Sequence, residues 1–332
     1  MKSTVSADAA VVIVHYRRPD LANACLRSLG AASRGLTLEI VVIDNGSGDG
    51  SADELEPQTE NTKIVRLTEN RGFAAGVNSG FENTRAPIVI LLNQDTEAEP
   101  DALTKLVDHL RSNASTGVAA PTLLHADGRF QASAHRQFPN LLTTFITFCS
   151  PLADVFPGVG RFRVRASRAL RAMRHPEGLT GDESLHITEV AHVAGAALAI
   201  RRAAFEEVGP FDEGFFLYLE ETEWQRRVHS AGWRIELVPD ARVVHLIQGG
   251  ESTGAPSPRY VESLYRYMEL QGVSDDRLDA TLVVASSISC AYHWTIGRVS
   301  PTRRPTNDRL LRAHRGYLRY VLGRRRQRRS TH

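Results

Sequence analysis

The chain has 332 residues, of which 42% are hydrophobic and 23% are charged, a mixture typical of globular proteins and not of disordered or fibrous ones. Its three cysteines lie far apart and form no CxxC pair, which argues against a zinc site or a disulfide framework and favours a reducing cytoplasm. No segment approaches the roughly 18 consecutive apolar residues of a membrane-spanning helix, and the N-terminus lacks the pattern of a signal peptide.

The net charge of +2 conceals a strongly basic tail. Residues 300–332 contain eleven arginines and one acid, Asp308, and carry +10, so that residues 1–299 carry −8. Such a tail either contacts an anionic partner, for example lipid headgroups at the inner face of the cell membrane, or remains solvated. Nucleic acid is not expected as a partner, because aromatic residues are not interleaved with the basic ones as a stacking platform requires.

The first 120 residues alternate apolar runs with helical patterns. Four near-continuous apolar runs have the character of strands buried on both faces, namely 11–15, 39–43, 63–67 and 88–92. The spacing of apolar residues between them predicts helices over 20–29, 72–81 and 101–110. This alternation predicts a parallel α/β sheet covered by helices.

The rest of the chain changes character twice. Residues 121–190 are less regular, and order returns with predicted strands over 192–200 and 233–238 and predicted helices over 201–208 and 221–231. From about residue 260 the pattern is helical, with apolar stripes. We therefore expect an α/β domain followed by a helical extension.

Polar clusters follow the predicted strands, where ligands bind in an open parallel sheet. They are His15, Tyr16 and Arg17 after the first strand, Asp44 after the second, Asn70, Arg71, Gly72 and Asn78 after the third, and Asn93, Gln94 and Asp95 after the fourth. Asn93 and Asp95 offer two oxygen donors that could hold a hard divalent cation together with a diphosphate. Taken singly, Asp44 and the glycines are equally typical of ordinary turns.

Taken together, the segments resemble the inverting glycosyltransferases of family 2, over about residues 11–252. The resemblance implies the GT-A fold, a Rossmann-like, mostly parallel central α/β sheet flanked by helices, over residues 1–250, with a helical, Arg-rich extension over 251–332. Residues 1–120 would form the nucleotide-binding half, and 121–250 the acceptor and catalytic half. The segments NQDTE, FDEGFFLYLEE and HLIQGGES are similar to the rhamnosyltransferase-type branch, which works on bacterial cell-surface polysaccharides or glycolipids.

The resemblance assigns roles in donor binding. Asp44 resembles the carboxylate that accepts a hydrogen bond from the ring N–H of a pyrimidine base. His15, Tyr16 and Arg17 resemble the loop around that base. Residues 70–78 resemble the segment that flanks the ribose and diphosphate, with Asn70, Arg71, Gly72 and Asn78 as its candidate contacts.

A metal site is implied as well. Asn93, Gln94 and Asp95 occupy the position of the family's metal-binding DxD motif, and His245 matches a later metal or diphosphate contact. Asparagine at position 93 removes one negative charge, so Asp95 becomes the principal ligand of the expected Mg²⁺ or Mn²⁺.

The candidates for the catalytic base are glutamates at the start of the helix predicted over 221–231. Glu220, Glu221 and Glu223 would ordinarily be solvated there, but the apolar run 215–219 before them suggests a pocket nearby. The resemblance identifies Glu221 as the general base, with Glu220 as the alternative. Gly195 would let the sugar or acceptor approach the backbone, although close packing alone would also favour glycine.

These inferences predict an enzyme that transfers a sugar, with inversion, from a nucleoside diphosphate to a hydroxyl of a glycan or lipid-linked acceptor. L-Rhamnose from dTDP-L-rhamnose is the favoured donor. The alternatives are a UDP-hexose or UDP-N-acetylhexosamine transferase of the same fold and a non-catalytic nucleotide-sugar-binding protein. We expect the protein in the cytoplasm, in solution or peripheral at the membrane through its basic tail, and the sequence leaves open whether it forms a homodimer.

Overall fold

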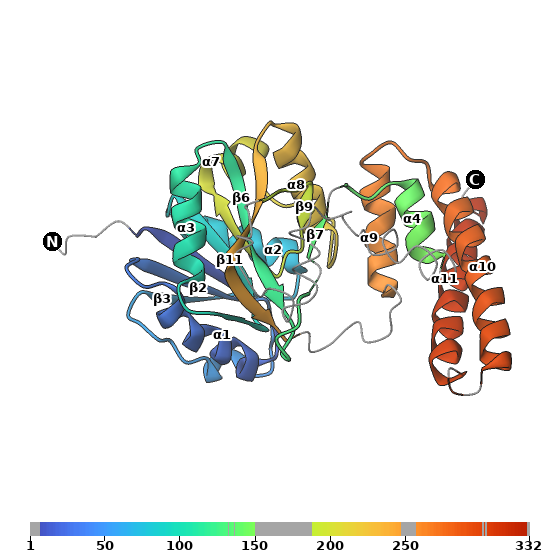
Figure 1. The fold of residues 1–332 in the computed structure, drawn as a ribbon, viewed down its shortest axis with the longest axis horizontal. Helices are drawn as coiled ribbons and strands as arrows, with labels where there is room; N and C mark the ends of the chain where they lie inside the picture. Colours follow the sequence, from blue (N-terminus) through green and yellow to red (C-terminus); the bar gives the residue numbers. More distant parts are fainter. Residues whose placement is uncertain are drawn as a thin grey trace, which may run out of the picture. The chain divides into compact units, whose positions relative to one another are not determined.

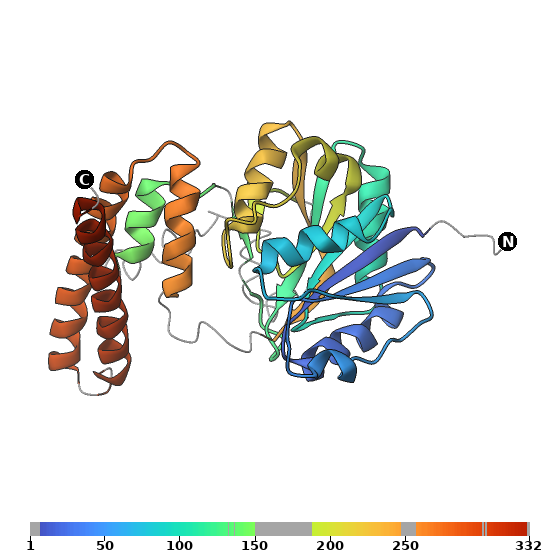
Figure 2. The same ribbon diagram turned by 180° about the vertical axis from the view of Figure 1, so that it is seen from behind.

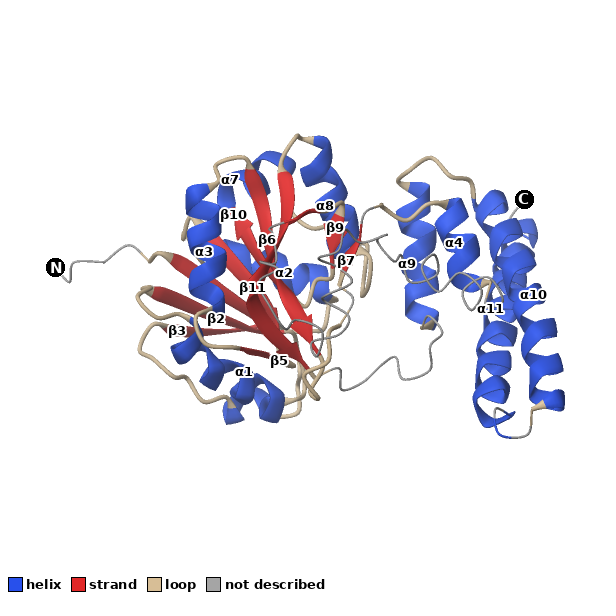
Figure 3. Ribbon diagram, viewed as in Figure 1, coloured by secondary structure: helices blue, strands red, loops and turns tan. Residues whose placement is uncertain are grey.

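The computed structural model describes residues 7–131, 133–135, 137–149, 188–246, 257–300, 302 and 304–330. The chain divides into two compact units, of which the first comprises 1–138 with 166–248 and the second 139–165 with 249–332. Figure 1 and Figure 3 draw the first unit as a sheet covered by helices and the second as helices alone. Residues 248–252, which end the last family segment, lie outside the described residues.

The sheet of the first unit has the strand order β3-β2-β1-β4-β10-β6-β11-β5, with β8 pairing with β11. These strands are β1 (Ala9–His15), β2 (Leu38–Asp44), β3 (Thr62–Arg66), β4 (Ile88–Asn93), β5 (Thr96–Ala98), β6 (Thr116–Leu124), β8 (Thr188–Glu189), β10 (Ala197–Arg201) and β11 (Arg234–His245). The β3-β2-β1-β4 block is parallel, β10 runs antiparallel to both β4 and β6, and β11 is parallel to β6. The predicted sheet, mostly parallel and flanked by helices, is thereby confirmed.

Two strands differ from their predicted extents. The run predicted over 192–200 is divided into β9 (His192–Val193), which pairs with β7 (Ala134–His135), and β10, because the chain turns at Gly195 and Ala196. The strand predicted over 233–238 continues to His245 as β11, with a register shift between Val238 and Arg242. The shift accommodates Pro239, which has no N–H to give to the ladder.

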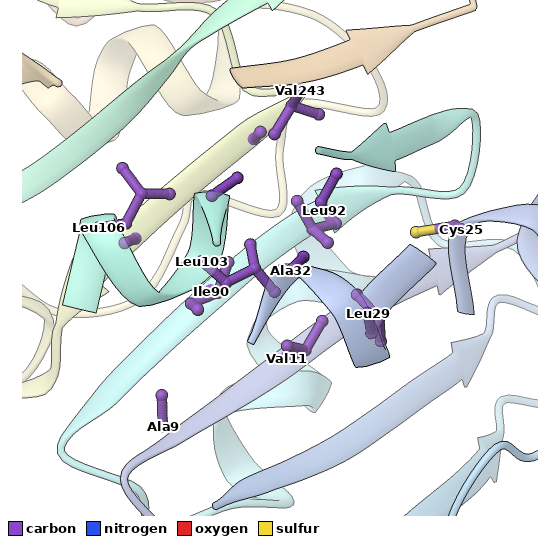
Figure 4. Close-up of a cluster of buried hydrophobic side chains, with 14 of the residues drawn as sticks. Ala9, Val11, Cys25, Leu29, Ala32, Ile90, Leu92, Leu103, Leu106 and Val243 are labelled. Carbon is purple, nitrogen blue, oxygen red and sulfur yellow. The ribbon is translucent and has the colours of Figure 1, made fainter. Parts of the chain in front are cut away.

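Helices cover both faces of the sheet because β1 and β4 are apolar at every position that faces a helix. Val11 and Ile13 of β1 pack with α1 (Pro19–Ala32) and α3 (Ala102–Ser112), and Figure 4 shows this cluster of side chains. Val12 and Val14 pack on the other face, where α2 (Phe73–Glu82), α7 (Arg202–Val208) and α8 (Glu220–Ser230) contribute. Figure 2 shows α2 along this second face. The strands are thus buried on both sides, as their continuous apolar runs predicted.

The second unit is helical and draws on two separate stretches of chain. It contains α4 (Leu141–Phe148), α9 (Pro258–Glu269), α10 (Asp275–Val299) and α11 (Arg304–Ser330). Phe148 of α4 is fully buried, its carbonyl accepts from the Ser289 hydroxyl of α10 at 2.8 Å, and its ring meets Tyr317 of α11 edge-on at 5.1 Å. The helical extension expected after residue 250 therefore includes a helix from before residue 150.

The basic tail is an integral part of this unit. Leu311, Tyr317 and Val321 of α11 are buried, so the apolar side of the helix packs within the protein. Arg325 and Arg328 form ion pairs with Asp279 of α10, whose carboxylate is fully buried and also accepts from the Tyr265 hydroxyl. Part of the positive charge is thus neutralised inside the unit. Within the described residues, no helix is both long and apolar enough to cross a membrane.

Candidate active site

The strand register brings the predicted donor-site residues to one edge of the sheet. His15 pairs with Asp44 across β1 and β2, and Val14 pairs with Asn93 across β1 and β4. His15 is fully buried, its Nδ1 donates to Gln94 Oε1 at 3.0 Å, and burial lowers its pKa. A neutral, buried imidazole here fixes the orientation of Gln94.

The loop after β1 is held in a strained conformation. Gln94 accepts from the Tyr16 backbone N–H at 3.1 Å and donates to the Tyr16 carbonyl at 3.2 Å. Arg17 has a left-handed backbone with φ of 55°, and its N–H donates to Ser47 Oγ at 3.1 Å. Its guanidinium lies 4.9 Å from the centre of the Tyr16 ring. A non-glycine residue keeps this conformation only where its surroundings hold it in place. Such residues are common at functional sites.

The loop after β2 is fixed by its own polar side chains. Asp44 is buried and accepts from the Ser47 N–H at 3.1 Å. Asn45 donates to Asn70 Oδ1 at 3.2 Å and to the Gly72 carbonyl at 2.9 Å. Asn45 is a connecting residue that the sequence analysis did not identify, and it joins the second and third polar clusters.

A further set of contacts connects this edge to the segment before α8. The Phe73 N–H donates to the Phe216 carbonyl at 2.9 Å. Gly72 has φ of 94°, and a Cβ there would lie 2.5 Å from the Phe216 oxygen. Only glycine permits this close approach without strain.

Arg71 and Asn78 both bind Glu213, which sequence analysis did not identify. Asn78 donates to Glu213 Oε1 at 3.0 Å and exchanges two 2.9 Å hydrogen bonds with the Phe211 backbone, while Arg71 forms an ion pair with Glu213. In this structure both side chains therefore position residues 211–216. Glu213 lies within the FDEGFF segment, so its acidic character was visible in the sequence but its partners were not.

The acidic pair lies at the start of α8, directly after two residues with left-handed backbones, Tyr218 and Leu219. The Oε2 atoms of Glu220 and Glu221 are buried with no hydrogen-bond partner among the described residues. Burial, and secondly the charge of Glu221, raise the pKa of Glu220 well above its ordinary value. Burial also raises the pKa of Glu221, opposed by backbone N–H groups that include that of Gly195. A carboxylate with a raised pKa is suited to accept a proton.

The third glutamate of the cluster is used differently. Glu223 is buried, and both of its oxygens accept from Arg227 Nε at 3.0 Å. Arg227 also donates to the carbonyls of Val208 and Pro210. Glu223 therefore orients Arg227, and Arg227 connects α8 to the end of α7 and the residues after it.

Gly195 lies against Glu221. A Cβ at position 195 would lie 3.0 Å from Glu221 Cγ and 3.2 Å from its Cβ, closer than side chains normally approach. The Asn93 N–H donates to the carbonyl of the neighbouring Ala196 at 2.9 Å. Glu221 and the end of β4 therefore both contact the turn formed by Gly195 and Ala196.

Asp95 and His245 form the candidate metal pair. β5 and β11 pair antiparallel, with Thr96 opposite His245, and His245 Nε2 lies 3.4 Å from Asp95 Oδ1. The other ring nitrogen, Nδ1, lies 3.2 Å from Gln131 Oε1, which orients the ring and which no sequence signal predicted. The amide oxygen of Asn93 is buried with no hydrogen-bond partner among the described residues.

The residue types at these positions are compatible with a divalent cation only if a substrate supplies further ligands. One carboxylate, one imidazole and one amide oxygen are ligands that Mn²⁺ accepts and that Mg²⁺ accepts in part. Within the described ranges, no group of three or more His, Cys, Asp or Glu side chains could hold a metal alone. Oxygens of a diphosphate would have to complete the coordination.

The sheet order, the polar strand edge and the buried acid beside it define a glycosyltransferase with the GT-A fold. Residues 10–209 match the model of glycosyl transferase family 2, and the chain belongs to this family. The membership predicted from the sequence, with its likeness to the rhamnosyltransferase-like branch, is confirmed, and the chain is a glycosyltransferase.

Relatives and a solved structure agree with this assignment. The chain is 26% identical over 247 residues to the N-acetylglucosaminyl-diphospho-decaprenol L-rhamnosyltransferase of Mycobacterium tuberculosis, which covers 71% of this chain and 75% of the relative. It is 31% identical over 139 residues to the undecaprenyl-phosphate 4-deoxy-4-formamido-L-arabinose transferase of Pseudomonas fluorescens, covering 40% of this chain and 39% of that protein. The crystal structure of GalNAc-T7 with UDP, GalNAc and Mn²⁺ has a TM-score of 0.53 at 16% identity, over 79% of this chain and 48% of its own, and shows the fold alone.

Gly195→Ala tests the contact with Glu221. The added methyl must displace the Glu221 side chain, and a misplacement of about 1 Å at a reacting group costs on the order of 10²-fold in rate. We therefore expect kcat, measured by steady-state kinetics, to fall at least about tenfold. The affinity for the nucleotide, measured by calorimetric titration, should be unchanged. Gly30→Ala is the matched control, because nothing lies within 4 Å of a Cβ at that helical position. A wild-type kcat for Gly195→Ala would mean that the observed placement of Glu221 is not needed.

Proposed function

We propose that this protein transfers L-rhamnose, with inversion, from dTDP-L-rhamnose to a hydroxyl group of a polyprenyl-linked glycan acceptor. The names of two relatives support the acceptor class, since one contains decaprenol and the other undecaprenyl phosphate. The more extensive of these matches, over 71% of the chain, is to a rhamnosyltransferase, which supports the donor sugar.

The observation that carries the proposal is the proximity of a base to the end of β4. Glu221 lies against Gly195, and the Asn93 N–H donates to the adjacent Ala196 carbonyl. A carboxylate able to accept a proton thus lies near the strand end where Asn93 and Asp95 would bind the donor diphosphate. An inverting transfer needs these two elements on opposite sides of one sugar.

The reaction is a single displacement at the anomeric carbon. A bond forms between that carbon and the acceptor oxygen, and the bond to the diphosphate oxygen breaks, with its electron pair going to the diphosphate. Glu221 takes the proton of the attacking hydroxyl, which is typically worth about 10² to 10⁴ in rate. Attack from the face opposite the leaving group inverts the configuration of the sugar.

The remaining residues bind and orient the donor. Asp44 would accept from the base N–H, and the loop of Tyr16 and Arg17 would lie along the base. Asp95, His245 and Asn93 would hold Mg²⁺ or Mn²⁺, which supplies positive charge for the leaving diphosphate. Asn78 and Arg71 would act indirectly, since their contacts are with residues 211–213.

The donor is tested with a panel of nucleotide sugars. The purified protein is incubated with a polyprenyl-diphospho-N-acetylglucosamine analogue and with dTDP-L-rhamnose, UDP-glucose or UDP-N-acetylglucosamine, and the released nucleotide is measured. We expect dTDP release from the rhamnose donor alone. UDP release would reassign the donor within the same fold, and binding without any release would identify a nucleotide-sugar-binding protein.

Glu221→Gln separates catalysis from binding. The amide keeps the shape of the side chain but cannot accept a proton, so we expect kcat to fall by about 10² or more with donor affinity retained. In the wild type kcat should rise with pH, because the base must be ionised to accept a proton. The midpoint of this rise should lie above the ordinary pKa of a glutamate side chain, because burial raises the pKa of Glu221. Glu220→Gln is the comparison, and a larger loss there than in Glu221→Gln would move the base to Glu220.

The metal requirement is tested by removing the metal and by restoring a negative charge at position 93. We expect activity to be lost in excess EDTA and to return with Mn²⁺ or Mg²⁺, because Asn93, Asp95 and His245 supply a single negative charge. Asn93→Asp should tighten Mn²⁺ binding, measured by electron paramagnetic resonance in the presence of dTDP. Full turnover in EDTA would contradict the metal requirement, and weaker Mn²⁺ binding by Asn93→Asp would remove Asn93 from the site.

A further inference from the structure

Gln225 of α8 is a fully buried polar side chain with a complete set of backbone partners. Its Oε1 accepts from the Val193 N–H at 2.9 Å, and its Nε2 donates to the Val193 carbonyl at 2.8 Å. Nε2 also donates to the Glu221 carbonyl at 3.0 Å. A side-chain amide has two N–H donors, and here both are bonded within the protein. Gln225 therefore joins β9 to the helix that begins with the acidic pair.

β9 lies beside α8 and depends on this amide for part of its hydrogen bonding (Figure 3). On the side of β7, the N–H groups of Ala191 and Ala194 donate to the carbonyls of His135 and Ser133. Val193 is buried, and its N–H and carbonyl bond to the Gln225 side chain instead. Buried backbone groups without a partner are costly. The amide thus supplies from a helix the pair of bonds that a third strand would otherwise provide.

The bonds to Val193 hold the turn that faces the acidic pair. Gly195 follows Val193 by two residues, and its N–H donates to the Glu221 carboxylate. A Cβ on Gly195 would lie 3.0 Å from Glu221 Cγ. Gln225 and Glu221 are four residues apart, so they lie on the same face of α8. One helix face thus holds the strand at Val193 and contacts the turn at Gly195.

The rest of α8 is held by other contacts. Trp224 is fully buried and donates from Nε1 to the Gly209 carbonyl at 3.0 Å. Arg227 donates to further carbonyls in the segment 208–210. These bonds lead to the end of α7 and the residues after it, and not to β9. Loss of the Gln225 amide should therefore release the strand and its turn while the helix stays in place.

We propose that Gln225 is a positioning residue for the base, because it holds Val193 against α8 so that the Gly195 turn and the Glu221 carboxylate keep their contact. This inference rests on the proposed function, in which Glu221 takes the proton of the acceptor hydroxyl. Gln225 acts through the turn, since its amide is bonded to backbone groups. Its effect therefore falls on the orientation and ionisation of Glu221, and not on donor binding.

Loss of the amide should change the ionisation of Glu221 in a defined direction. Burial raises the pKa of Glu221, and the Gly195 N–H opposes this rise, because a hydrogen bond to a carboxylate stabilises its ionised form. Without that bond the pKa of Glu221 should rise further, and catalysis should require a higher pH. The ionisable neighbours on α8 and on the segment 192–196 are unchanged by such a substitution, namely Glu220, Glu223 and His192.

Gln225→Met tests the proposal. Methionine keeps the length of the side chain but has no N–H donor and only a weak acceptor. With nucleotide release as the assay, we expect kcat to fall at least about tenfold, the KM for the donor to be unchanged, and the pH midpoint of kcat to move upward. A general loss of folded protein would not move that midpoint. A wild-type kcat with an unmoved midpoint would overturn the proposal.

Trp224→Phe is the matched control. It removes the hydrogen bond from the adjacent residue of α8 to the Gly209 carbonyl and leaves the bonds between Gln225 and Val193 in place. We expect a lower thermal unfolding temperature in both variants and a shifted pH midpoint in Gln225→Met alone. Equal shifts of the midpoint would also overturn the proposal, because general loosening of the helix would then be the cause.

Amide hydrogen exchange tests the same contact without any activity. In the wild type the N–H groups of Val193 and Gly195 should exchange slowly. Gln225→Met should speed the exchange of both while the amides of α8 stay protected. If that variant does not fold, Gln225→Asn should have the same effect, because its shorter side chain does not reach Val193. Fast exchange of Val193 and Gly195 in the wild type would contradict the inference.

These measurements distinguish a failure of this inference from a failure of the proposed function. A Glu221→Gln variant with a wild-type kcat would contradict the proposed function and, with it, the purpose of the contact. An inactive Glu221→Gln variant together with a Gln225→Met variant that behaves as the wild type would contradict this inference alone.

Discussion

The site depends on the burial of β1 between β2 and β4. Each residue from Ala9 to His15 is buried, and alternate side chains serve the two opposite helical layers. A slip of one residue against β2 would exchange the two layers and separate His15 from Asp44. Because both apolar layers resist such a slip, the register that assembles the polar edge is fixed by the packing of the helices on the two faces of the sheet.

The acidic pair is held where carboxylates are unfavourable. Glu220 is buried and Glu221 is half-buried, burial raises the pKa of both carboxyl groups, and Tyr218 and Leu219 before them adopt a backbone conformation that costs free energy. Residues 211–216, which precede this segment, are held by contacts with Arg71, Phe73 and Asn78. The loop before the acidic pair is therefore the same loop that contacts the polar ends of the strands.

The sequence predicted what depends on local pattern. The buried strands of the parallel block, the helices between them and the polar strand ends followed from apolar periodicity, and ordered motifs indicated the family. The partners of Asn78 and the orientation of His245 by Gln131 did not follow, because each joins residues more than 100 positions apart. The roles of the site residues in binding and catalysis stay predictions. The membership of α4 in the helical unit was likewise invisible, since only the fold brings Phe148 to Tyr317.

That shared membership has a consequence for biosynthesis. Phe148 leaves the ribosome long before Ser289 and Tyr317, its partners in the folded protein. A nascent chain that ends before α10 therefore exposes the apolar α4, and exposed apolar segments of incomplete chains tend to associate. Truncation at the end of the sheet would not release an independent catalytic domain with a clean boundary, because it would leave α4 without the helices that bury Phe148.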